Sequence, residues 1–314
     1  MNIKIIALHH FEAYAIIYGN QYYISICEKD KEKCFMKYKI IGDSSCDVTD
    51  AMREVMNIEL VPLTLEVDGI RYVDNDDLDV ANYLEKANAS TMVPKSSCPS
   101  PDDYMKAIEG EEEAVFIITL SSELSGSYGS AMLAKNMFQE KQPEKKIHVF
   151  DSRSAVSAEV LIALKVQECI QADMEFEEIV EIGEKFRKEM QTLFVLEKID
   201  HLQKAGRMSK MKATIANILH IKLILQATDK GEIDLVSQAR GTKKAIDKMI
   251  QTIGELGTVT KDKVIVVAHC QAQERGEQVK EKIQELYDFK DVILIAMKGL
   301  SSNYANIGGI VIAY

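Results

Sequence analysis

The chain has 314 residues, of which 46% are hydrophobic, and this is enough for two globular domains with cores of their own. Its 49 acidic and 38 basic residues give a formal net charge of -11, and no dense stripe of lysine and arginine occurs. This balance argues against nucleic acid or an anionic membrane surface as the main partner, and leaves small molecules and proteins.

The six cysteines, at positions 27, 34, 46, 98, 169 and 270, form no CxxC pair and no Cys/His cluster with zinc-like spacing. We therefore expect free thiols and no metal site. No apolar stretch is long enough to cross a membrane, and His9, His10 and Glu12 interrupt the opening segment where a signal peptide needs a continuous apolar core. A cytoplasmic location is the expectation.

A charged run at residues 28–33 separates the first 36 residues from the rest of the chain. Met36 directly precedes a strand-like segment and is a candidate start of the native chain. On this interpretation residues 1–35 are not native, and residues 1–36 together form an N-terminal extension ahead of the first domain. The alternative interpretation is a native N-terminal hairpin.

From Lys39 onward, short apolar runs alternate with amphipathic ones. The expected strands are 39–41, 60–65, 114–119 and 147–150, and the expected helices are 80–87, 102–108, 126–138, 155–170 and 176–190. This alternation predicts an α/β domain over residues 37–190 with a mainly parallel sheet. Ligands of such sheets bind at the carboxyl ends of the strands. Four serines are expected at those ends: Ser44, Ser121, Ser125 and Ser152.

The pattern changes in residues 191–314. The expected strands are 193–195, 221–227, 233–238, 264–269, 292–296 and 310–314, and the expected helices are 242–256 and 274–286. Six strands with few helices predict a second α/β domain with two layers and a mixed sheet.

Residues 120–128 form a hydroxyl-rich turn between a buried strand and a helix. Such a turn directs free backbone N–H groups and the positive end of the helix dipole at one spot, which favours a carboxylate or phosphate oxygen. The alternative interpretation is that Ser125 only caps the helix.

A second serine cluster lies at residues 94–104, where prolines stiffen the loop. Ser100 is expected to be the N-cap of the following helix, with Pro101 in its first turn. Ser96 and Ser97 have no such local role, because they lie upstream of the cap in a segment that Pro99 biases toward extended geometry. They are free to point at a ligand.

Short motifs follow one another along the chain in a specific order. They lie at residues 41–47, 62–63, 95–101, 120–131, 149–152, 202–208 and 240–245. A shared order of motifs is far more specific than any single serine turn. On this basis the chain, over residues 37–314, resembles the DegV family, the FakB-type fatty acid-binding proteins.

The resemblance implies two segregated α/β domains, the first three-layer with a mainly parallel Rossmann-like sheet, the second two-layer with a mixed sheet. It implies a long-chain fatty acid in an internal tunnel that the second domain closes. It also implies a bacterial, non-enzymatic carrier, without a cofactor, that presents the fatty acid carboxylate to a separate fatty acid kinase catalytic subunit for acyl-phosphate formation in phospholipid synthesis. Contact with the membrane is expected to be only transient.

The resemblance also assigns site residues. Ser96 stands where the family has the threonine of its TSQPS loop, and Ser125 stands at the serine of its LSGTY turn. Tyr304 replaces the histidine of the THVGPG segment. These three hydroxyls are expected to bind the carboxylate. The supporting residues expected around them are Ser97, Ser122 and Arg207, the last of which matches the arginine of the GGR segment.

Two other functions stay open at this point. A serine hydrolase or esterase would use Ser125 with Asp151 and either His148 or His269, although Ser125 does not lie in a G-x-S-x-G elbow. A carrier of a small hydroxyketone, as in the dihydroxyacetone kinase substrate subunit, would need a reactive histidine, and none of the six histidines lies in the motifs.

Overall fold

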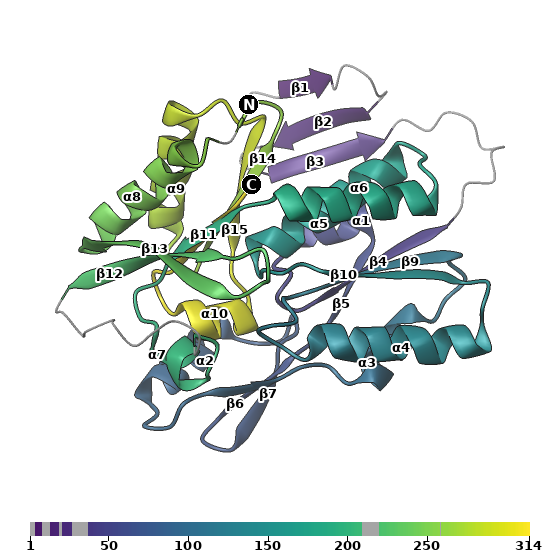
Figure 1. Cartoon of the computed structure of the whole chain (residues 1–314), viewed down its shortest axis with the longest axis horizontal. Coiled ribbons are helices and arrows are strands. Elements are labelled where there is room, and N and C mark those ends of the chain that lie inside the picture. Colours follow the sequence, from purple (N-terminus) through teal and green to yellow (C-terminus); the bar gives the residue numbers. More distant parts are fainter. Residues whose placement is uncertain (1–3, 8–12, 19–20, 27–36, 209–219, 258) are drawn as a thin grey trace.

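A computed structural model describes residues 4–7, 13–18, 21–26, 37–208, 220–257 and 259–314 (Figure 1). The first domain contains a four-stranded parallel sheet with the strand order β10-β9-β4-β5. Its strands are β4 (Tyr38–Asp43), β5 (Ile58–Val61), β9 (Ala114–Thr119) and β10 (Lys146–Asp151). All six residues of β9 are buried, as expected for a strand covered on both faces.

Helices cover both faces of this sheet, so the predicted three-layer arrangement is confirmed (Figure 1). On one face lie α3 (Pro101–Ile108) and α4 (Ser127–Lys141); on the other lie α5 (Ser157–Gln171), α6 (Phe176–Glu189) and the short α1 (Asp50–Met56). Ser100 is the N-cap of α3, and its side chain forms a reciprocal capping box with Asp103. The cap predicted at Ser100 is therefore confirmed.

The single strand expected at residues 60–65 is wrong. The structure has two strands there in different sheets, β5 and β6 (Thr64–Val67), with Pro62 between them. Proline has no N–H to give to a strand ladder, so a break at this position is favoured. β6 pairs antiparallel with β7 (Ile70–Val73) and β8 (Lys95–Ser97), and β8 carries Ser96 and Ser97. Helix α2 (Val80–Ala89) lies between β7 and β8 in the chain.

The second domain has a six-stranded mixed sheet with the order β13-β12-β11-β16-β14-β15. Among its described strands, β14 and β15 pair in parallel and the other pairs are antiparallel. Its strands are β11 (Thr192–Val195), β12 (Ile221–Ala227), β13 (Ile233–Arg240), β14 (Val264–His269), β15 (Asp291–Ala296) and β16 (Ile310–Ala313). Helices α8 (Thr242–Glu255) and α9 (Gln273–Leu286) pack on one face, as predicted.

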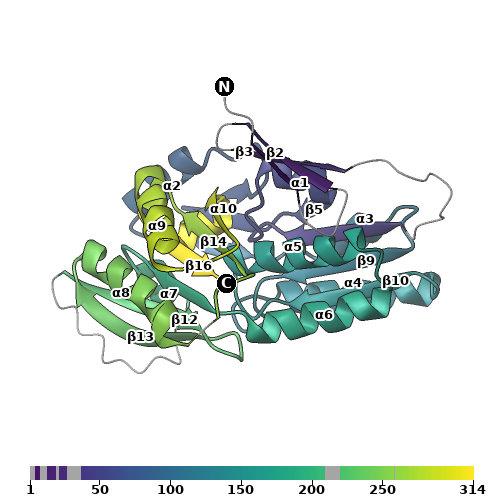
Figure 2. The same ribbon diagram turned by 90° about the horizontal axis from the view of Figure 1, so that it is seen from above.

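The other face of the six-stranded sheet is turned toward the first domain. Helix α5 packs against β14 and β16, and Figure 2 shows the two domains side by side. One hydrophobic core is continuous across this junction, because it joins Phe116 and Phe150 of the first sheet to Phe194 and Val311 of the second. Two short helices of the second domain were not predicted, α7 (Asp200–Lys204) and α10 (Gly299–Ala305).

The N-terminal strands β1 (Lys4–Ala7), β2 (Ala13–Tyr18) and β3 (Gln21–Ile26) form an antiparallel sheet of three strands rather than a hairpin. Over the described ranges, this sheet pairs with no strand of the two domains. No described helix combines the length and the apolar character needed to cross a membrane.

Candidate functional site

A cavity of about 300 Å³ lies at the junction of the two domains. Most of its wall is apolar and comes from both domains; these residues include Leu63, Leu120, Leu124, Val156, Phe194, Leu196, Leu202, Ile233, Leu300 and Val311. Hydroxyl side chains interrupt the apolar wall: Ser45, Ser96, Ser97, Ser125, Ser154, Thr192, Ser301 and Tyr304. An apolar cavity with a few placed polar groups is the usual form of a small-molecule site.

Two of the predicted carboxylate-binding residues meet across the domain junction. Ser96, on β8, and Tyr304, on α10, place their hydroxyl oxygens 2.8 Å apart. Either oxygen can be the donor in this bond, so one hydroxyl proton is used within the pair and the other stays available. The pair can therefore donate one hydrogen bond to a ligand oxygen.

Ser125 lies in the turn before α4 and also faces the cavity. Its hydroxyl accepts a hydrogen bond from the Ser127 N–H at 3.2 Å, while the assigned N-cap, Gly126, has no side chain to cap the helix. Ser125 thus supports the first turn of α4 through its oxygen. Its hydroxyl proton is not needed for that bond, so the capping role and ligand binding are compatible.

The turn that carries Ser125 is fixed from several sides. Gly126 approaches Cys98 so closely that a Cβ on the glycine would lie 3.1 Å from the cysteine sulfur. Arg207 lines the cavity, and its guanidinium donates to the carbonyl oxygens of Leu124 at 3.1 Å and Ala205 at 2.7 Å. Arg207 therefore braces the serine turn and leaves a cationic group in the cavity wall.

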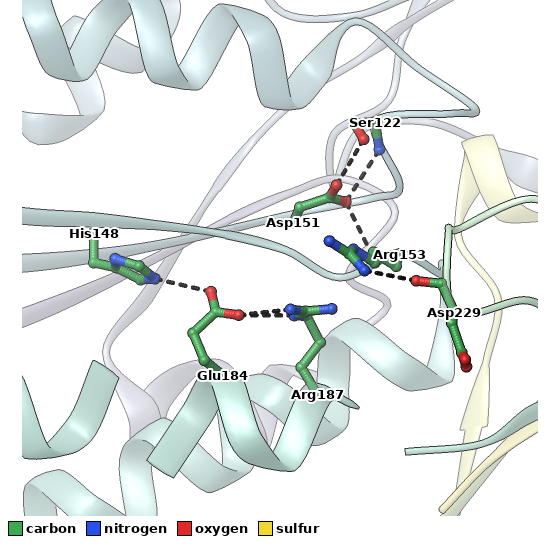
Figure 3. Close-up of polar contacts among 7 residues, drawn as sticks. All are labelled: Ser122, His148, Asp151, Arg153, Glu184, Arg187 and Asp229. Atoms are coloured by element: carbon green, nitrogen blue, oxygen red, sulfur yellow. Dashed lines mark hydrogen bonds and ion pairs between the residues drawn. The ribbon is translucent and has the colours of Figure 1, made fainter. Parts of the chain in front are cut away.

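Of the other predicted supporting residues, Ser97 lines the cavity and Ser122 does not. Ser122 is exposed and donates both its hydroxyl, at 2.6 Å, and its N–H, at 3.1 Å, to the carboxylate of Asp151 (Figure 3). This strong pairing holds the Ser122 side chain at the surface, outside the cavity wall. Ser122 was expected to support the site from outside it, and its bonds to Asp151 place it behind the serine turn and outside the cavity wall.

Asp151 connects the serine turn to the second domain (Figure 3). Its carboxylate also accepts the Arg153 N–H at 3.0 Å, and the Arg153 guanidinium donates to the Asp229 carbonyl oxygen at 2.7 Å. In the same region the Ser121 hydroxyl donates to the Gly231 carbonyl oxygen at 2.7 Å. The β12–β13 turn of the second domain is thus held against the serine turn of the first.

Sequence reasoning missed a group of buried carboxyl groups close to the cavity. Asp43 is fully buried and accepts hydrogen bonds from the N–H groups of Ser45 and Leu120 and from the Ser127 hydroxyl. Even so, burial raises the pKa of Asp43. Burial also raises the pKa of Glu159, whose carboxyl accepts the Val156 N–H.

Two more buried aspartates hold helix α10. Asp74 accepts the N–H groups of Gly299 and Leu300, and Asp47 accepts the N–H of Lys298. Burial raises the pKa of Asp74, and it raises that of Asp47 to about 8. Asp43 and Asp47 could have been found from the sequence, because they lie at the carboxyl end of β4 and just after it, where ligand sites of parallel sheets form.

The structure does not assemble a catalytic triad around Ser125. His148 lies 3.2 Å from the carboxylate of Glu184, a residue of α6 (Figure 3). His269 lies 2.7 Å from the side-chain oxygen of Gln273, a residue of α9. In the described part of the chain, no histidine lines the cavity. Among the described residues, therefore, neither histidine of the hydrolase alternative is paired with Ser125, and no histidine is placed to bind a hydroxyketone in the cavity.

The sequence model of a family described as "Uncharacterised protein, DegV family" matches residues 37–314. A DegV domain-containing protein of Streptococcus pneumoniae (strain ATCC BAA-255 / R6) is 36% identical over 281 residues, which cover 89% of this chain and 99% of that protein. A solved DegV family structure from Ruminococcus gnavus with vaccenic acid is 41% identical, covers 89% of this chain and 100% of its own, and has a TM-score of 0.86. The solved structure of the Streptococcus pneumoniae fatty acid kinase B3 protein loaded with linoleic acid is 36% identical. The match covers 89% of this chain and 99% of that one, with a TM-score of 0.82.

Proposed function

The chain belongs to the DegV family, and from this premise we propose that it binds a long-chain fatty acid in the cavity between its two domains. The carboxylate is held by the hydroxyls of Ser96, Ser125 and Tyr304, and Arg207 supplies the nearby positive charge. The observation that carries the proposal is the combination of an apolar cavity with these converging hydroxyls. Similar proteins of known structure contain vaccenic and linoleic acid, which supports this ligand class.

The apolar wall accounts for affinity and the hydroxyls for orientation. Each methylene moved from water into an apolar cavity contributes about 0.8 kcal/mol, so a dozen methylenes contribute about 10 kcal/mol before the costs of association. Hydrogen bonds to a charged group add about 1.5–3 kcal/mol each. The acyl tail therefore dominates binding, and the serine and tyrosine hydroxyls fix which end of the ligand lies between β8, α4 and α10.

We further propose that the protein is a non-enzymatic, cytoplasmic carrier. It presents the carboxylate to a separate fatty acid kinase catalytic subunit, which forms the acyl phosphate used in phospholipid synthesis, and it meets the membrane only transiently. Residues 37–190 supply the serine loops, residues 191–314 close the lipid pocket, and residues 1–36 are an extension outside this unit. The similarity to a fatty acid kinase B3 protein supports the kinase partner.

Native mass spectrometry of the protein purified from cells tests the lipid ligand. We expect a copurifying long-chain fatty acid, and a protein that is empty and also takes up no added fatty acid would refute the proposal. The carrier role is tested separately by adding the loaded protein, ATP and a bacterial fatty acid kinase catalytic subunit. Acyl-phosphate formation that requires all three components is the expected result, whereas turnover without the kinase would show an enzyme.

A further inference from the structure

Helix α10 carries a second hydroxyl that faces the cavity. Ser301 precedes Tyr304 by three positions, so the two side chains lie on the same face of the helix, separated by a rise of about 4.5 Å. Ser301 is 5% exposed, and its Oγ forms no well-aligned hydrogen bond to a described residue, although it lies beside the Asp47 carboxyl. A hydroxyl can donate one hydrogen bond and accept two, so beside Asp47 it keeps the capacity to bond a ligand oxygen that reaches it.

A carboxylate is not the group that fits there. The acid beside it is Asp47, whose Oδ2 is also buried. The Ser301 hydroxyl lies near enough to lower the pKa of Asp47, but burial has the larger effect and raises it. Three further buried carboxyl groups belong to the same region: Asp43, Asp74 and Glu159. A negative ligand group beside Ser301 would face these acids without a solvent shield.

A neutral oxygen has no such penalty. A hydroxyl group on the ligand can both donate to and accept from Ser301, and it adds no charge near the buried acids. The carboxylate itself is accommodated one helical turn away, at Ser96 and Tyr304, where Arg207 lies in the wall. The cavity thus offers one position for an anion and one, more deeply buried, for a neutral polar group.

We propose that Ser301 forms a second polar subsite that accepts a hydroxyl group on the acyl chain, so that the preferred ligand is a long-chain hydroxy fatty acid with its hydroxyl close to the carboxylate. This inference rests on the proposed function. The helical rise between Ser301 and Tyr304 limits the hydroxyl to the first few carbons of the chain.

The test compares hexadecanoic acid with 3-hydroxyhexadecanoic acid in titrations of the delipidated full chain. A neutral hydrogen bond contributes about 0.5–1.5 kcal/mol, so the Kd of the hydroxy acid should be about 2–12-fold lower than that of the plain acid. In Ser301→Ala this preference should vanish or invert, because the ligand hydroxyl is then buried without a partner.

Ser302→Ala is the matched control. Ser302 lies on the same helix and is fully buried, but its hydroxyl donates to the Met297 carbonyl oxygen and it does not line the cavity. This variant should keep the wild-type preference. If Ser301→Ala does not fold, Ser301→Cys, which keeps the volume but has only a weak donor, gives the same readout.

The inference is overturned if the wild-type protein binds both acids equally, or if Ser301→Ala keeps the preference for the hydroxy acid. Failure of the wild-type protein to bind either acid is a different outcome. It would refute the proposed function itself, and with it the inference.

Discussion

The hydroxyl oxygens of Ser96 and Tyr304 lie 2.8 Å apart although the two residues are 208 positions apart in the chain. Ser96 is on the edge strand β8 of the first domain, and Tyr304 is in the last turn of α10 in the second. The proposed carboxylate site is therefore complete only when the domains pack together. This arrangement couples head-group binding to the domain interface.

Removing the Tyr304 hydroxyl should weaken fatty acid binding. Tyr304→Phe keeps the ring and deletes one partner of the Ser96 hydrogen bond, so we expect fatty acid affinity to fall by about 10-fold or more, with little change in melting temperature. Titration calorimetry and thermal unfolding of the delipidated protein measure the two effects. Unaltered affinity would show that Tyr304 does not lie beside the carboxylate.

The two serines should behave alike in binding. Ser96→Ala and Ser125→Ala should each weaken fatty acid retention by about 1.5–3 kcal/mol and leave the fold intact. Ser100→Ala is the control, because it removes only the α3 cap, which should cost about 1 kcal/mol of stability without affecting the ligand. If Ser125→Ala lowers the melting temperature but holds fatty acid as tightly as the wild type, Ser125 is a capping residue only.

The stability of the ligand-free protein should fall as the pH rises. Burial raises the pKa of Asp47 to about 8, whereas an aspartate in the unfolded chain has a pKa of about 3.9. Between these values the folded state binds more protons than the unfolded state, so each pH unit removes up to about 1.4 kcal/mol of the free energy of unfolding. Urea unfolding between about pH 5 and 8 measures this slope.

Asp47→Asn should reduce that slope, because asparagine can still accept the Lys298 N–H but does not titrate. The slope should not vanish, since burial also raises the pKa values of Asp43, Asp74 and Glu159. An unchanged slope in Asp47→Asn would contradict the assignment.

Fatty acid affinity should stay nearly flat between about pH 6 and 7, because no described histidine lines the cavity.

A chain that begins at Met36 should fold and bind fatty acid as well as the full chain. The sheet β1–β3 pairs with no strand of the two domains in the described ranges, and the DegV match begins at residue 37. Circular dichroism, thermal unfolding and fatty acid titration compare the two chains. Insolubility of the shorter chain would show that residues 1–35 are structural.

The sequence by itself determined the order of the main elements and the class of both sheets. Local signals suffice for these features: the apolar run of β9 is long enough for a strand covered on both faces, and the Ser100 cap with Pro101 marks the start of α3. The serine loops were also recognisable from the sequence, because Ser96 and Ser97 have no helix-capping role in their own segment. Elements as short as α7 and α10 were missed, since five to seven residues carry too little periodicity to predict a helix.

Only the tertiary structure decided which polar groups face the cavity. Ser122 and Ser125 lie three positions apart in one turn, yet Asp151 holds the first at the surface and the second faces the cavity. Ser301 and Ser302 are adjacent on α10, yet the first hydroxyl faces the cavity and the second donates to the Met297 carbonyl oxygen ahead of the helix. Such outcomes depend on contacts between residues far apart in the chain, which no local sequence pattern encodes. The same holds for the raised pKa of Asp47, because its cause is burial in the folded protein.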